Sequence, residues 1–110
     1  MKQYELWWAA LPAPAGRRPV LLLSRDAAYT YLNKFVAAEV TTTVRHIAVE
    51  VPLGRAEGLL VKSAANLDNI RTVARSALLQ RIGSLSARRQ SEVKRAVGHA
   101  LAWEELLEAE

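Results

Sequence analysis

The sequence predicts a mainly β domain of the α+β class, in which about five to seven short antiparallel strands form a small barrel-like sheet and one helix follows. Two observations support this class. As far as residue 73, short apolar or alternating runs are separated by proline and glycine, which is typical of strands joined by tight turns. From residue 86 onward, apolar residues recur at three- and four-residue spacing, as on one face of a helix. Residues 1–110 are enough for a single domain and too few for two.

Six segments have the composition of β-strands. In the first, Trp7 and Trp8 are adjacent, so we expect one of them on each face of the sheet. The last segment alternates imperfectly, which predicts a bulge or a polar strand end beside a site. The segments cover residues 4–10, 19–23, 34–41, 47–51, 58–62 and 65–73.

The connections are predicted from turn-forming residues. Proline and glycine indicate a loop over residues 11–16 and a break in the chain over residues 52–54. Asp26 is suited to cap a short helical turn over residues 27–29.

The C-terminal helix has its own start signal and apolar face. Ser86 is suited to be its N-cap. Its apolar positions run from Val93 to Leu101, and Leu107 continues the spacing. Gly98 inside this helix costs about 1 kcal/mol relative to alanine, which suggests close packing at that point.

Positive charge is concentrated in most of the chain. The net charge is +4, but four of the eleven acidic residues lie in the last seven positions, so residues 1–103 carry a net charge of +8. Most of the basic residues are arginine, whose planar fork of donors suits phosphate. A phosphate-rich partner such as nucleic acid is one interpretation, and an ordinary solvated surface is the other.

Several classes of chemistry lack their residues. Without cysteine there is no disulfide, thiolate metal site or thiol nucleophile, and a reducing compartment is expected. The two histidines, His46 and His99, have no metal-binding spacing, and no glycine-rich phosphate loop is present. A metal-independent mechanism without cofactors, or no catalysis, remains. With no signal peptide and no run of the ~20 apolar residues that span a bilayer, we expect a cytoplasmic protein without membrane contact.

Two local features draw attention as candidate site elements. In Gly16-Arg17-Arg18-Pro19, the proline favours an extended Arg18 at the start of a strand. In Thr41-Thr42-Thr43, hydroxyl groups stand at the end of a strand. Each also has a structural interpretation, as an ordinary basic loop and as strand-end hydroxyl bonding.

Seven short segments occur in a characteristic order between about residue 4 and residue 102. They cover residues 5–12, 16–26, 41–43, 50–54, 58–59, 66–73 and 82–85. No single segment is specific, but the ordered set resembles the MazF/PemK toxin endoribonucleases of type II toxin–antitoxin pairs. The resemblance implies a five-stranded SH3-like or CcdB-like barrel with added strands and helices. It also implies a homodimer that cuts single-stranded RNA at short sequences without a metal ion and is inhibited by a cognate antitoxin.

The resemblance also assigns site residues. Arg18, which precedes the proline of the Arg-Pro pair, matches the catalytic arginine of the family. Thr41, twenty-three residues later, matches its catalytic threonine or serine, with Thr42 as the second choice. Asp68 and Asn69 match positions that contact RNA bases. The remaining expected RNA-binding residues are Arg17, Thr42, Arg45 and Arg71, with Lys62 as a further phosphate contact.

The chain departs from the family pattern in the loop before Arg18. Residues 12–16 form a short loop without an acid, whereas in some members an acidic side chain from this loop contributes to the site. Two other functions stay open on the residues alone. One is a CcdB-like toxin that binds DNA gyrase, and the other is a non-catalytic SH3-like RNA-binding module. Trp7 and Trp8 suit a core or dimer interface better than base stacking, and His46 suits a polar loop better than proton transfer.

Overall fold

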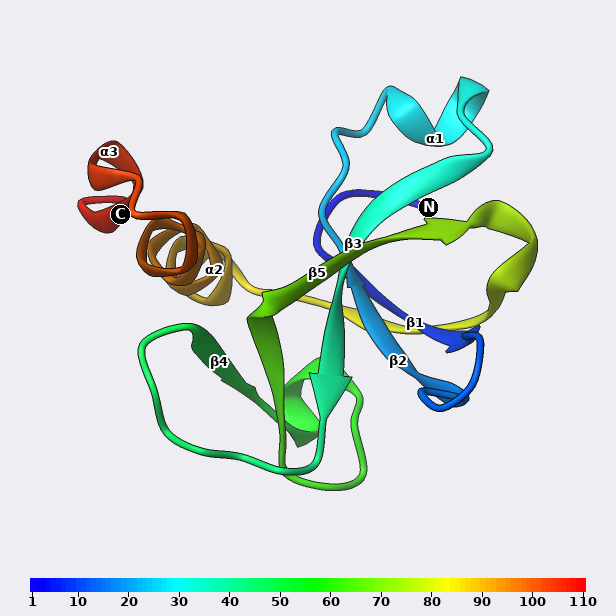
Figure 1. Cartoon of the computed structure of the whole chain (residues 1–110), viewed down its shortest axis with the longest axis horizontal. Coiled ribbons are helices and arrows are strands. Elements are labelled where there is room, and N and C mark those ends of the chain that lie inside the picture. The colour runs from blue at the N-terminus through cyan, green and yellow to red at the C-terminus, as the bar shows by residue number, and fades with distance from the viewer.

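The structure is a computed structural model that describes all 110 residues. Six strands form one antiparallel sheet in the order β4-β5-β3-β2-β1-β6, which curls into a half-barrel (Figure 1). The predicted fold class, mainly β with a C-terminal helix, is confirmed. The strands are β1 (Glu5–Ala10), β2 (Arg17–Leu22), β3 (Lys34–Thr41), β4 (Glu50–Leu53), β5 (Ser63–Ala74) and β6 (Leu78–Ser84). The helices are α1 (Ala28–Tyr31), α2 (Ala87–Leu101) and α3 (Glu104–Leu107), with 3₁₀ turns η1 (Arg55–Glu57) and η2 (Arg75–Ala77).

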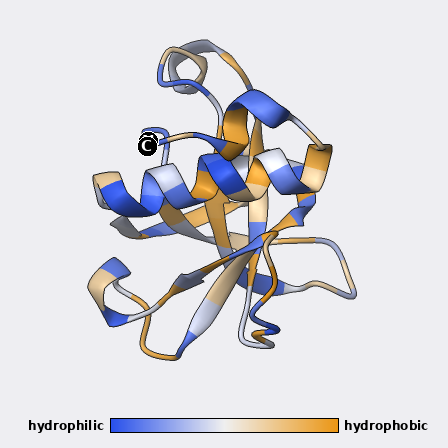
Figure 2. Ribbon diagram, turned by 90° about the vertical axis from the view of Figure 1, so that its left-hand side faces the viewer, coloured by the Kyte–Doolittle hydropathy of each residue, from blue (hydrophilic) through white to orange (hydrophobic).

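The core has two parts, one on each face of the sheet. Successive residues of a strand point to opposite faces, so Ala38 and Val40 of β3 join one cluster and Phe35 and Ala37 the other. The first cluster includes Val93 of α2, which lies across this face of the sheet (Figure 2). The opposite face of β3 is not covered by α2, and there its polar residues are available for a site.

The adjacent tryptophans of β1 lie on opposite faces, as predicted. Trp7 packs against the second cluster. Trp8 is half-buried on the other face, where the guanidinium carbon of Arg17 lies 5.2 Å from its ring centre. Arg17 therefore points away from the face that Arg18 occupies.

Two predicted strands differ in the structure. The segment 47–51 enters the sheet only at Glu50, and β4 then continues through Pro52 to Leu53. Pro52 is tolerated because β4 is an edge strand, where a missing N–H can face solvent. Residues 58–62 form a loop rather than a strand, with Leu60 90% exposed. These residues are largely apolar, but no neighbouring strand is there for their backbone to pair with.

Strand β6 was not predicted. It pairs with β1 at the other edge of the sheet and is exposed or half-buried along its whole length. An edge strand of this kind has no fully buried face, so its sequence lacks the alternation that reveals a strand. Strand β5 was predicted, but it is longer than the expected segment and extends from Ser63 to Ala74.

The start of the C-terminal helix is confirmed, and its end is corrected. The Ser86 hydroxyl accepts a hydrogen bond from the backbone N–H of Arg89. The helix ends at Leu101, so Leu107 belongs to α3, which packs beside α2 (Figure 1). Gly98 permits this packing because an added Cβ would lie 2.9 Å from the backbone nitrogen of Leu107. None of the helices is both long and apolar enough to cross a membrane.

The predicted cap of the first helical turn is wrong. The N-cap of α1 is Ala27, with no side-chain cap. The carboxylate of Asp26 instead accepts a hydrogen bond from the backbone N–H of Gln3 at 2.7 Å. The Asp26 carboxylate therefore binds a backbone N–H that is distant in the sequence instead of one in its own helical turn.

Candidate functional site

The register of the sheet brings Arg18 and Thr41 together. Pro19 lacks an N–H and favours an extended conformation of the residue before it, so Arg18 belongs to β2. Val20 pairs with Glu39 across β2 and β3. Two further steps of that antiparallel register bring Arg18 level with Thr41, the last residue of β3. Residues two apart on a strand share a face, so Arg18 lies on the same face as Val20, and Thr41 on the same face as Glu39. This is the face opposite α2.

Glu39 holds two arginines in this region. One carboxylate oxygen lies 3.0 Å from Nη1 of Arg18, and the other lies 3.0 Å from Nη1 of Arg71 on β5. The Glu39 side chain is 16% exposed, and both guanidinium groups are about one-third exposed. Nε of Arg18 also donates to the carbonyl oxygen of Ala15 at 3.4 Å. The Arg18 guanidinium is thus positioned from two sides.

The predicted bulge in β5 lies next to these residues. Ala38 pairs with Ile70 and the following residue, Glu39, pairs with Asn66, so residues 67–69 have no partner on β3. Leu67 points into the core, whereas Asp68 is exposed. The bulge is confirmed, and it brings Asn69 to the same polar wall as Arg18.

These residues surround a small hollow of about 90 Å³, called here the polar pocket. No apolar residue lines it. Glu50 lies in its wall, where Oε1 accepts the backbone N–H of Arg45 at 2.8 Å and the buried Oε2 has no hydrogen-bond partner. The lining residues are Arg18, Glu39, Thr41, Thr43, Arg45, Glu50, Asn66 and Asn69.

A wider hollow of about 590 Å³ shares Arg18 and Glu39 with the polar pocket. The loop of residues 12–15 forms one side of it, and Arg71 completes the wall. Arg18, Glu39 and Arg71 therefore line a continuous cationic surface with one carboxylate at its centre. A phosphate or another anion is the ligand that such an array of donors suits.

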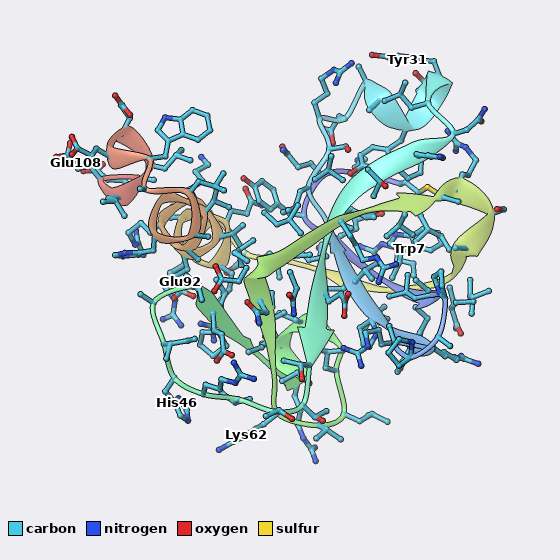
Figure 3. The ribbon with its side chains drawn as sticks, in the orientation of Figure 1. Trp7, Tyr31, His46, Lys62, Glu92 and Glu108 are labelled. Carbon is cyan, nitrogen blue, oxygen red and sulfur yellow. The ribbon has the colours of Figure 1, made fainter.

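The predicted site residues are only partly gathered. Arg18, Thr41, Arg45 and Asn69 line the polar pocket, and Arg71 reaches it through Glu39. Outside it lie Arg17, Asp68 and Thr42, with Thr42 in a separate hollow that also contains His46 and Lys62. His46 and Lys62 point outward from loops at the lower end of the molecule in Figure 3.

The two neighbouring threonines can now be distinguished. Thr41 lines the polar pocket, and its Oγ1 accepts the backbone N–H of Thr43 at 3.0 Å. Thr42 faces the other hollow. Thr41, and not Thr42, therefore shares the polar pocket with Arg18.

Three pocket residues were missed by the sequence reasoning: Glu39, Glu50 and Asn66. Glu39 could have been found, since it precedes Thr41 by two positions on a predicted strand and so shares its face. The loop over residues 12–16 supplies no acid to the site. The carboxylate of Glu39, from β3, lies beside Arg18 instead. No group of three or more histidine, aspartate or glutamate side chains is placed to hold a metal ion.

Comparison with known protein families identifies the family of this chain. Residues 2–101 match the family described as PemK-like, MazF-like toxin of type II toxin-antitoxin system. The chain belongs to this family. The predicted resemblance is confirmed.

Individual relatives of this MazF-like toxin agree with the match. The chain is 42% identical over 83 residues to a probable endoribonuclease, MazF5, of Mycobacterium tuberculosis, covering 74% of this chain and 75% of the relative. The structure of the Mycobacterium tuberculosis toxin MazF-mt6 superposes with a TM-score of 0.83 at 34% identity, covering 89% of this chain and 96% of that one. A MazE-MazF crystal structure from Deinococcus radiodurans gives a TM-score of 0.76 at 26% identity, with coverages of 93% and 95%.

Proposed function

We propose that this MazF-like toxin is an endoribonuclease that cuts single-stranded RNA at specific short sequences without a metal ion. The observation that carries the proposal is that Arg18 and Thr41 line one wholly polar pocket. Relatives named as endoribonucleases support the enzyme class. Cleavage of cellular RNA in the cytoplasm inhibits translation and growth.

The scissile phosphate binds to Arg18 and Thr41. A guanidinium has five N–H groups, and in Arg18 only two are used, by Glu39 and by the carbonyl of Ala15. The others donate to the phosphate oxygens, and the Thr41 hydroxyl donates to the same group. Such donors stabilise the charge that develops on phosphorus in the transition state.

The nucleophile is the 2′-OH of the RNA itself. Its oxygen forms a bond to the adjacent phosphorus, and the bond from phosphorus to the 5′ oxygen of the next nucleotide breaks. The products are a 2′,3′-cyclic phosphate and a 5′-hydroxyl. DNA lacks the 2′-OH and is not cut.

The remaining predicted residues bind the RNA on either side of the cleaved bond. Arg45 and Arg71 contact phosphates, and Thr42 provides a polar contact, whereas the predicted Arg17 points to the opposite face of the sheet beside Trp8. Asp68, exposed on the β5 bulge, and Asn69, in the pocket wall, read base edges next to the cut. Sequence preference would arise from these two side chains.

Two protein partners belong to the proposal. A solved relative is a MazE-MazF structure, and we expect a cognate antitoxin for this chain as well. Its binding segment would be rich in acidic and apolar residues, to cover the basic face. We also expect the toxin to form a homodimer.

The test is incubation of the protein with a long single-stranded RNA in the presence of EDTA. Cleavage that yields cyclic-phosphate ends, and that an Arg18→Ala variant loses, is the expected result. Retention of RNA without cleavage would indicate a binding module instead. If the protein neither binds nor cuts the RNA, the proposal has no support.

A further inference from the structure

One carboxylate oxygen in the polar pocket has no partner. Glu50 is only 9% exposed, and its Oε2 is buried without any hydrogen bond. Burying a charged oxygen without a donor is unfavourable, and buried polar atoms in native proteins are nearly always paired. Glu50 also lines the polar pocket, so a ligand bound there would supply the missing donor.

The other carboxylate of the pocket, Glu39, already binds two arginines. Both oxygens of Glu39 accept hydrogen bonds from guanidinium groups, one from Arg18 and one from Arg71. Glu50 accepts only the backbone N–H of Arg45, through Oε1. Of the two carboxylates, Glu50 alone has an oxygen that accepts no hydrogen bond.

The position of Glu50 in the sheet is set by Asn66. In the ladder, Asn66 of β5 pairs with Glu39 on one side and with Glu50 on the other, so the three side chains form a row across β3, β5 and β4. The charged groups around Glu50 in the pocket are Arg18 from β2, Glu39 from β3 and Arg45 from the loop before β4. Glu50 thus shares the pocket with both residues proposed to hold the phosphate.

We propose that Glu50 is the general base of the cleavage reaction. This inference rests on the proposed function. The 2′-OH lies next to the scissile phosphate, so it is the RNA hydroxyl nearest to a pocket that holds that phosphate. Arginine is a poor base because it stays protonated, and a carboxylate is a suitable one.

In this step, proton transfer to Glu50 is coupled to substitution at phosphorus. Oε2 of Glu50 takes the proton of the 2′-OH as the 2′ oxygen bonds to phosphorus. The 5′ oxygen leaves and takes a proton from solvent water. Glu50 then returns its proton to solvent.

The experiment compares Glu50→Gln with Glu57→Gln in single-turnover cleavage of an end-labelled single-stranded RNA across a range of pH. Glutamine keeps the size of Glu50 and an acceptor for the Arg45 N–H, but it cannot take the proton. Glu57 is the matched control: it is also buried, and its Oε1 accepts the backbone N–H of Gly54 at 2.7 Å, but it lies outside the polar pocket. Thermal unfolding of both variants verifies that they fold.

We expect Glu50→Gln to slow cleavage by at least about 10²-fold. The rise of the wild-type rate with pH on the acid side should disappear in this variant, a change that a merely structural role would not cause. Binding to an RNA with 2′-deoxy sugars should be as tight as for the wild type, while Glu57→Gln should keep the wild-type rate and profile.

The outcomes separate the two proposals. If the wild type cleaves RNA and folded Glu50→Gln keeps its rate, or is slower with an unchanged pH profile, the base assignment is overturned alone. If the wild type does not cleave RNA at all, the proposed function fails and this inference fails with it.

Discussion

The guanidinium of Arg18 and the carboxylate of Glu39 lie 3.0 Å apart, on neighbouring strands and on the face of the sheet opposite α2. The same carboxylate binds Arg71 at 3.0 Å through its other oxygen. One acidic side chain therefore orients two arginines that come from different strands. This arrangement connects the site to the pairing of β2, β3 and β5, and it leads to the first two predictions.

Replacing Arg18 should abolish most of the activity. Arg18→Ala removes the donors to the phosphate, and we expect cleavage to slow by about 10²–10³-fold. Arg18→Lys should recover only part of the rate, because lysine cannot make two parallel hydrogen bonds to phosphate. Single-turnover cleavage of single-stranded RNA measures both. Arg88→Ala is the control, since Arg88 is an exposed residue of α2, and a loss of activity there equal to that of Arg18→Ala would contradict the assignment.

Glu39→Gln should reduce activity less than Arg18→Ala. The amide cannot balance two guanidinium groups, so Arg18 would lose part of its orientation and cleavage should slow by about tenfold, within the range that positioning effects reach. The free energy of unfolding should fall by about 1 kcal/mol, since both ion pairs are partly exposed. Urea unfolding and single-turnover kinetics measure the two effects. Faster cleavage in the variant would show instead that Glu39 competes with the phosphate.

The two threonines should differ in which kinetic constant they affect. Thr41→Val replaces a hydroxyl of the polar pocket with a methyl group and also removes the acceptor of the Thr43 N–H, and we expect kcat to fall by about 10²-fold. Thr42→Val changes a residue of the other hollow and should raise KM with little change in kcat. Steady-state kinetics of the two isosteric variants decides between them. The reverse pattern would assign the catalytic hydroxyl to Thr42.

Glu5 should make stability depend on pH in the acid range. Burial by itself would raise the pKa of Glu5, but hydrogen bonds from Trp7 and Arg81, and the charge of Arg81, lower this pKa below its ordinary value of 4.5. Because the folded-state pKa is depressed, the stabilisation is complete above the unfolded-state value and is lost as the pH falls through the folded-state pKa. Glu5→Gln should therefore unfold more easily at neutral pH, by about 1 kcal/mol, and lose less stability on acidification. Urea unfolding at pH 7 and below pH 4.5 measures the difference, and equal losses in both proteins would contradict it.

Gly83 should not tolerate a side chain. A Cβ at this position of β6 would lie 2.2 Å from the backbone carbonyl oxygen of Glu57, so η1 would have to move away from the strand. We expect Gly83→Ala to cost about 1–3 kcal/mol of stability, as overpacking does elsewhere. Gly54→Ala is the matched control, because no atom lies within 4 Å of its added Cβ. Chemical unfolding of both variants measures the difference, and equal stabilities would argue against a close contact between β6 and η1.

Predictions from the sequence succeeded where local pattern and burial agree. The apolar runs of β2 and β3, the Ser86 cap of α2 and the irregular β5 were all readable, because each has a buried side that shapes the spacing of its apolar residues. Strand β6 was missed because an edge strand without a fully buried face leaves no such signal.

By itself the sequence determined the mainly β class, the family resemblance and the choice of Arg18 and Thr41 as candidate partners. Only the tertiary structure decided that Glu39 orients Arg18 and Arg71, that Thr42 faces away from the polar pocket, and that Glu50 keeps an unpaired oxygen in its wall. The reason is that neighbours across a sheet are set by strand order and register. Arg18, Glu39 and Arg71 are far apart along the chain, and only the pairing of β2, β3 and β5 brings them within hydrogen-bonding distance.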